Sequence, residues 1–210
     1  MGQALVWGAS GGIGSALVRR LTEEGWTVMG VARDPGSMTA IPSRQVQADV
    51  ADEASVRQAV ADLDVSAGTL DLWIYAVGDI TSSGVGNMPV EDWNRILDAN
   101  LTGAYLAAKH SLGLLAEDAH MFFFGAVSER LRLPGLAAYA SAKAGVEALA
   151  EVLRKEQRKR RVSVVRPKAV ATAIWDKVPF GLPRGALQPE DVADRVVAAY
   201  DEGHTGVLDL

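Results

Sequence analysis

Two ionisable side chains, four residues apart, occupy a segment that we expect to be helical. Tyr139 and Lys143 bound the sequence Tyr-Ala-Ser-Ala-Lys. Positions i and i+4 share one helix face, so a phenol and an ammonium group can point into one cleft. A tyrosine with a pKa of about 10 is a weak acid–base catalyst at neutral pH, and a neighbouring lysine lowers that pKa by stabilising the phenolate. The pair suits a proton donor for a carbonyl group, although this spacing is common and carries little weight alone.

A glycine-rich turn near the N-terminus is the second functional signal. An expected apolar strand is followed by Gly8, Ala9, Ser10, Gly11, Gly12, Ile13 and Gly14, and then by an expected helix. Glycines permit a tight turn and let backbone amides approach a pyrophosphate. The helix N-terminus adds N–H groups and a positive dipole end. Its position at the first strand–helix junction favours a dinucleotide site over a turn with no ligand.

The end of the second expected strand bears on the choice of cofactor. Ala32 stands where an acid would accept hydrogen bonds from the ribose 2′-hydroxyl of NAD, and Arg33 follows it. A guanidinium suits a 2′-phosphate instead. We therefore expect NADP (NADPH) to be preferred over NAD. The neighbouring Asp34 weakens this interpretation, and an ordinary surface arginine is the alternative.

Together the motifs resemble the short-chain dehydrogenase/reductase (SDR) family, in its classical subgroup, over essentially the whole chain. The glycine turn is similar to the family's TGxxxGIG segment, and Tyr139 with Lys143 is similar to its YxxxK pair. Three further segments match in order: Asp49-Val50 resembles the adenine-contacting pair, Asn100 opens an N-x-x-G segment, and Pro167 with Thr172 resembles the segment beside the nicotinamide. Each motif is loose, but all of them in order at the family's spacing are highly specific.

The resemblance implies hydride transfer between a nicotinamide cofactor and a carbonyl or alcohol substrate. Tyr139 would exchange a proton with the substrate oxygen. Lys143 would hold the nicotinamide ribose and lower the pKa of Tyr139, while Asn100 would distort its helix and hold a water. The residues expected to bind the cofactor are Gly8, Ser10, Gly11, Gly12, Ile13, Gly14, Arg33, Asp49, Val50, Ala76, Gly78, Tyr139, Lys143, Pro167 and Thr172.

The sequence departs from the family most clearly on the substrate side. The family has a serine that hydrogen-bonds the substrate oxygen thirteen positions before the tyrosine, and here that position is Ala126. We expect Ser128 to supply the hydroxyl through a loop that folds back after Gly125; the alternative is that the hydroxyl is absent. A missing oxyanion donor costs about 10²–10³ in rate.

Other departures are Tyr75 at the start of the family's N-N-A-G segment and Lys168 after Pro167. Residues 173–187 also form a shorter segment than the substrate lid that the family usually has.

Apolar runs alternate with amphipathic segments along the chain. We expect strands at residues 4–7, 27–32, 45–48, 70–76, 121–124, 162–165 and 207–210, and helices at 15–24, 55–63, 91–115, 139–158 and 190–201. This alternation indicates βαβ units, and nearly continuous apolar strands fit a sheet covered on both faces. The expected α/β fold is a Rossmann-type, doubly wound parallel sheet of about seven strands with helices on both faces. We expect one domain over residues 1–210, with the catalytic site included.

Composition narrows the class of protein. Apolar residues make up 49% of the chain and charged residues 22%, which excludes a disordered or fibrous protein, and the net charge of −5 argues against a nucleic-acid partner. Cysteine is absent, so no disulfide or thiolate chemistry is expected, and we expect no metal site. No signal peptide and no run of about 18 apolar residues is found, so a cytoplasmic location and no membrane contact are expected.

Two functions follow from these observations. The first is an NADP(H)-dependent oxidoreductase that acts on a small-molecule ketone, aldehyde or alcohol. The second is a dinucleotide-binding SDR-like protein with weak or no turnover, acting as a redox sensor or scaffold, which Ala126, Tyr75 and Lys168 favour. The presence of Tyr139 and Lys143 favours the enzyme. The resemblance further implies a homodimer or homotetramer, formed through the helix that carries Tyr139.

Overall fold

In the computed structural model, a single parallel sheet runs through the part of the chain that is described, residues 2–34, 36, 44–63, 69–126 and 133–210. Its strands are β1 (Gln3–Trp7), β2 (Thr27–Ala32), β3 (Arg44–Gln47), β4 (Leu70–Tyr75), β5 (Leu115–Phe124), β6 (Arg161–Arg166) and β7 (Gly206–Asp209). The seven strands lie in the order β3-β2-β1-β4-β5-β6-β7. The order therefore reverses between β1 and β4, which confirms the expected doubly wound sheet and marks the point where such sheets bind ligands.

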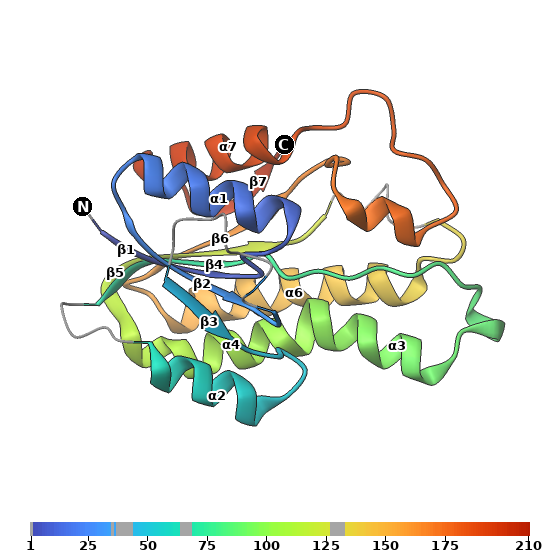
Figure 1. Cartoon of the computed structure of the whole chain (residues 1–210), viewed down its shortest axis with the longest axis horizontal. Coiled ribbons are helices and arrows are strands. Elements are labelled where there is room, and N and C mark those ends of the chain that lie inside the picture. The colour runs from blue at the N-terminus through green and yellow to red at the C-terminus, as the bar shows by residue number, and fades with distance from the viewer. Residues whose placement is uncertain (1, 35, 37–43, 64–68, 127–132) are drawn as a thin grey trace.

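Helices cover both faces of the sheet (Figure 1). One face carries α1 (Gly12–Glu23) and α7 (Pro189–Asp201), and the other carries α2 (Glu53–Asp62), α3 (Val90–Leu97), α4 (Gly103–Ser111) and α6 (Ala137–Glu156). None of the helices in the described ranges has the length and apolar character needed to cross a membrane.

The core consists of two apolar clusters, one on each face of the sheet. Along β1, Leu5 and Trp7 belong to the cluster under α2, α4 and α6, while Ala4 and Val6 belong to the cluster under α1 and α7. Successive side chains of a strand point to opposite faces, so a strand that is buried on both faces must be apolar throughout. Full burial of each large apolar side chain contributes roughly 1.5–3 kcal/mol.

The helix expected over residues 91–115 is interrupted in its middle. Helix α3 ends at Leu97, a π-helical turn covers Asp98–Thr102, and α4 then continues to Ser111. The amide of Asn100 donates to the carbonyl oxygens of Ile96 and Asp79, both at 2.8 Å. The Ile96 carbonyl is the partner that the Asn100 backbone would use in a regular α-helix, so the side chain competes with the helix at this point. The local distortion expected at Asn100 is present.

Strand β5 begins at Leu115, six residues before the expected start. Glu117 and Asp118 are exposed within it, and its pairing with β4 shifts register between Leu70 and Leu72. The apolar pattern becomes continuous only at Met121, after His120, which explains the error. The helix expected to end at residue 115 stops at Ser111, and the remaining expected helices and strands begin and end within three residues of the observed bounds.

Candidate active site

A cavity of about 460 Å³ opens at the carboxyl ends of the strands around β1 and β4. Its walls come from the glycine loop after β1, residues 31–33, 48–51 and 76–79, helix α3 and the π-helical turn. Lys177, at the end of a 3₁₀ segment (Ala173–Lys177), also lines it. In open α/β sheets, ligands bind in this crevice, beside the reversal of strand order.

The glycine loop has a conformation that side chains would block. Gly8 has a φ of +82°, and the backbone N–H groups of Gly8 and Ala9 donate to the Val31 carbonyl at 2.9 and 3.0 Å. A Cβ atom on Gly14 would lie 2.1 Å from the Gly8 carbonyl oxygen. Glycine is therefore required where the loop turns back on itself to enter α1.

The start of α1 offers backbone donors to the cavity. Gly11 is the N-cap residue, no side chain in the described ranges caps the helix, and its first turn contains no acidic residue. Thr172 packs against this turn, because a Cβ atom on Gly12 would lie 2.5 Å from the Thr172 methyl carbon. A cradle of N–H groups at a helix N-terminus fits the pyrophosphate of a dinucleotide. Ser10 and Gly11 line the cavity here, and Ile13 lies in the first turn.

The residues expected to bind the adenosine line the same cavity as the glycine loop. Arg33 follows β2, while Asp49 and Val50 follow β3. The Gln47 amide donates to the Arg33 carbonyl at 3.0 Å, which ties the two strand ends together. Ala76 and Gly78, after β4, line the cavity as well.

Three of the expected catalytic residues, Asn100, Lys143 and Tyr139, lie close together near Gly78. Lys143 is buried and donates to the Phe124 carbonyl at 2.9 Å, and its ammonium lies 5.5 Å from the centre of the Tyr139 ring. A Cβ atom on Gly78 would lie 3.4 Å from Asn100 Oδ1 and 4.0 Å from Lys143 Nζ. Asn100 Oδ1 is buried and has no hydrogen-bond partner among the described residues. A buried acceptor of this kind is ordinarily satisfied by a water, which fits the expected role of Asn100.

The ionisation of this pair differs from the sequence-based expectation. Burial raises the pKa of Tyr139 to about 12. Burial also lowers the pKa of Lys143 to about 8, an effect that the nearby Glu147 carboxylate opposes. The pKa of Tyr139 therefore lies above its ordinary value, where the sequence predicted a lower one, because desolvation of the phenol dominates. Near neutral pH Tyr139 retains its proton and Lys143 is charged, a combination suited to proton donation.

The substrate side is organised around the end of β5. Ala126 is buried there, and its backbone N–H donates to Glu147 Oε1 at 3.3 Å. Ser128 lies outside the described residues, so its expected role stays a prediction. Pro167 and Thr172 lie beyond β6, where the Trp175 indole donates to the Val170 carbonyl at 2.8 Å and fixes the segment that leads to Lys177.

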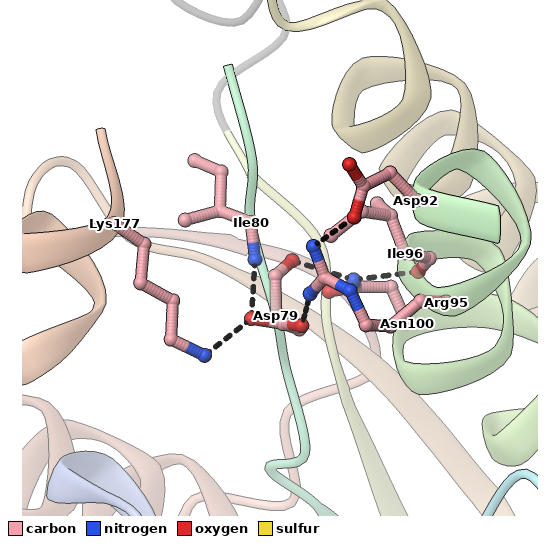
Figure 2. A network of polar contacts seen from close by, with 7 residues as sticks. All are labelled: Asp79, Ile80, Asp92, Arg95, Ile96, Asn100 and Lys177. Atoms are coloured by element: carbon pink, nitrogen blue, oxygen red, sulfur yellow. Dashed lines mark hydrogen bonds and ion pairs between the residues drawn. The ribbon is translucent and has the colours of Figure 1, made fainter. Parts of the chain in front are cut away.

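A network of charges at the cavity wall was not expected from the sequence (Figure 2). Asp79, directly after Gly78, pairs with Arg95 from α3 and with Lys177, whose ammonium lies 2.6 Å from Asp79 Oδ1. Arg95 also pairs with Asp92 at 3.0 Å. The one signal available in the sequence was the position of Asp79, four residues after the end of β4, at the ligand-binding edge of the sheet.

Tyr75 has a structural explanation. Its hydroxyl donates to the Ala99 carbonyl at 2.8 Å, within the π-helical turn. A Cβ atom on Gly103 would lie 2.5 Å from the Tyr75 oxygen, so the phenol fills space that this glycine leaves. Tyr75 thus braces the turn that holds Asn100, and it no longer favours a non-catalytic protein.

Comparisons with known proteins agree with this architecture. The family model for short chain dehydrogenase matches residues 3–180. An uncharacterised oxidoreductase of Staphylococcus epidermidis is 28% identical over 218 residues, which cover 99% of this chain and 94% of that protein. A solved Thermus thermophilus structure described as a short-chain oxidoreductase is 34% identical, with a TM-score of 0.82 over 93% of this chain and 94% of that one.

A more distant structure has the same fold. It is an alcohol dehydrogenase of Thermococcus sibiricus in complex with 5-hydroxy-NADP, 23% identical, with a TM-score of 0.90 over 100% of this chain and 96% of that one. The match of the family model over most of the chain shows that the protein belongs to the short-chain dehydrogenase family. It is therefore an oxidoreductase that uses a nicotinamide dinucleotide.

Proposed function

We propose that the protein transfers a hydride between NADP(H) and a small-molecule carbonyl or alcohol. The observation that carries this proposal is the convergence of Asn100 and Lys143 on Gly78, next to Tyr139, at the end of a cavity that starts at the glycine loop. A protein that only bound dinucleotide would need the loop, and Lys143 for the ribose, but would have no use for a proton donor such as Tyr139 beside that lysine.

The cofactor, when bound, supplies or accepts the hydride. The amides at the start of α1 would hold its pyrophosphate, and the Arg33 guanidinium would pair with its 2′-phosphate. Thr172 would lie beside the nicotinamide. Asp49 and Val50, with Ala76 and Gly78, would border the adenosine. Pro167 would border the nicotinamide, and Lys143 would hold the neighbouring ribose.

In the reducing direction, Tyr139 gives its hydroxyl proton to the substrate oxygen. Its pKa of about 12 keeps that proton in place until the oxygen becomes strongly basic. Lys143, charged below a pKa of about 8, stabilises the phenolate that remains. Asn100 Oδ1 accepts a hydrogen bond from a water that returns a proton to the tyrosine. Ser128 is proposed to donate a hydrogen bond to the substrate oxygen.

The proposal is tested by following NADPH fluorescence and absorbance with purified protein. We expect NADPH to bind more tightly than NADH, and to be oxidised when activated carbonyls such as diones and quinones are added. The alcohol products with NADP test the reverse direction. If neither nucleotide binds, the proposed function is wrong.

A second function, a redox sensor or scaffold, is favoured by Ala126, which lacks the family's hydroxyl, and by Lys168, which follows Pro167 where the family pattern differs. NADPH binding without turnover of any carbonyl or alcohol in the panel would favour it over the enzyme. We further propose that residues 1–210 form one domain, and that the protein is a cytoplasmic homodimer or homotetramer. Sedimentation equilibrium measures that oligomeric state directly.

A further inference from the structure

Three cationic side chains from separate elements line the cavity: Arg33 after β2, Arg95 on α3 and Lys177 on the 3₁₀ segment. Figure 2 shows Arg95 and Lys177 approaching the Asp79 carboxylate from opposite sides. Both cations form an ion pair with Asp79, whose side chain is only 14% exposed. One carboxylate therefore joins two walls of the cavity.

The acidic residues of the cavity make these cations important. Asp49, Glu91 and Asp98 line it together with Asp79, so four carboxylates face three cations. A dinucleotide adds at least two more negative charges, from its pyrophosphate. Cations that can approach the phosphates are needed to offset this repulsion. An ion pair that is already present in the cavity can supply such a cation.

Lys177 is better able than Arg95 to change partners. Arg95 is held by both Asp79 and Asp92, whereas Asp79 is the single carboxylate that pairs with Lys177 among the described residues. The Lys177 side chain is 51% exposed and has a flexible stem, so it can rotate at little cost. If it leaves, Arg95 still neutralises Asp79. Burial, Arg95 and Arg33 all lower the pKa of Lys177, so its surroundings disfavour the charged form of this lysine.

The backbone holds Lys177 close to the expected phosphate position. Thr172, five residues earlier, packs on Gly12 at the start of α1, and Trp175 anchors the segment between them. Five residues of 3₁₀ helix span roughly 10 Å. Lys177 also lines the same cavity as Ser10 and Gly11 of the glycine loop.

We propose that Lys177 is a cofactor-binding residue, whose ammonium leaves Asp79 when the dinucleotide binds and pairs with one of its phosphates. This inference rests on the proposed function. Asp79 then has the role of holding Lys177 at the cavity before the dinucleotide binds. Once Lys177 has left, Arg95 neutralises the Asp79 carboxylate. An ammonium group acts on a phosphate as a compact point charge, so the interaction does not require the bidentate geometry of arginine.

The first test measures NADPH affinity by fluorescence titration of Lys177→Met, which removes the charge and keeps most of the stem. We expect about tenfold weaker binding and a smaller loss of affinity with added salt than in the unchanged protein. Lys155→Met is the matched control, because Lys155 is exposed and pairs with Glu151 at the far end of α6. We expect it to bind NADPH like the unchanged protein.

A double-mutant cycle separates phosphate binding from a structural brace. Asp79→Asn removes the competing carboxylate, so we expect equal or tighter NADPH binding. Lys177→Met should then weaken binding by at least tenfold in the Asp79→Asn background as well. If the effect of Lys177→Met disappears in that background, the lysine acts only through Asp79 and the inference is wrong.

The same titrations with NADH identify the phosphate. An equal fold-change for NADPH and NADH assigns Lys177 to the pyrophosphate, and a loss confined to NADPH assigns it to the 2′-phosphate; both support the inference. If Lys177→Met binds both nucleotides as tightly as Lys155→Met does, the inference fails while the proposed function stands. If the unchanged protein binds neither nucleotide, both fail.

Discussion

The cofactor end of the cleft and its substrate end are built from different parts of the chain. At the cofactor end, backbone groups form the binding surface for the phosphates. They are the Gly8 turn, its hydrogen bonds to Val31 and the first amides of α1. At the substrate end, side chains from the π-helical turn and α6 converge on the strand ends, with Lys143 bonded to the Phe124 carbonyl and Glu147 to Ala126. The first end depends on local geometry, whereas the second depends on packing between distant segments.

This difference explains where the chain can depart from its family without losing the fold. The glycine loop tolerates no side chain at Gly14, because a Cβ atom there would lie 2.1 Å from a carbonyl oxygen. Around the substrate end, Tyr75 and Ala126 both differ from the family pattern, yet Tyr75 fits with its own hydrogen bond. Nucleotide binding should therefore be robust to substitutions that abolish chemistry, and the reverse should not hold.

The largest expected effect is a loss of kcat at the substrate end with no change of NADPH affinity at the cofactor end. Tyr139→Phe should lower kcat about 10²–10⁴-fold, because it removes the proton donor, and should leave NADPH affinity unchanged. Stopped-flow or steady-state NADPH oxidation, with fluorescence titration beside it, measures both quantities. Tyr105→Phe is the matched control, since Tyr105 is exposed on α4. A Tyr139→Phe protein as active as its parent would remove the proposed mechanism.

The fold and the cofactor end were predictable because their signals are local. Alternating apolar runs indicate strands that are buried on both faces, and the spacing from Gly8 to Gly14 indicates the loop directly. The roles of Tyr139, Lys143 and Asn100 came from their resemblance to a family pattern, which preserves spacing but not contacts.

The features that were missed are contacts between distant residues. Lys177 and Asp79 are 98 positions apart, and nothing in either segment indicates the other. The pKa of Tyr139 was predicted in the wrong direction, because spacing on a helix describes the neighbouring charge and says nothing about burial. The early start of β5 was missed because Glu117 and Asp118 interrupt its apolar pattern.

The second prediction tests whether the substrate end has its hydroxyl donor. Ser128→Ala should lower kcat at least tenfold if Ser128 bonds the substrate oxygen, with an upper range of about 10²–10³. Ala126→Ser should then add little. The opposite pair of results, a neutral Ser128→Ala and a large gain from Ala126→Ser, would mean that the donor is lost and would favour the binding protein.

The third prediction concerns the cofactor end alone. Arg33→Ala should weaken NADPH binding by about 1.5–3 kcal/mol, the contribution of a hydrogen bond to a charged group. NADH affinity serves as the internal control and should hardly change, because NADH has no 2′-phosphate. Titration of both nucleotides with both proteins gives the comparison. Tighter NADH than NADPH binding in the unchanged protein would contradict the assignment of Arg33.

The smallest expected effect concerns Tyr75, which braces the π-helical turn between the cofactor end and the substrate end. Tyr75→Phe removes the hydrogen bond to Ala99 and leaves that carbonyl without its partner, so the free energy of unfolding should fall by about 1 kcal/mol in urea denaturation. NADPH affinity should stay the same, because Tyr75 itself does not line the cavity. The kcat should fall less than tenfold, since the Asn100 side chain keeps its own bonds to Ile96 and Asp79. Unchanged stability combined with a loss of kcat as large as that of Tyr139→Phe would instead give Tyr75 a part in the chemistry. The bracing role assigned to it would then be wrong.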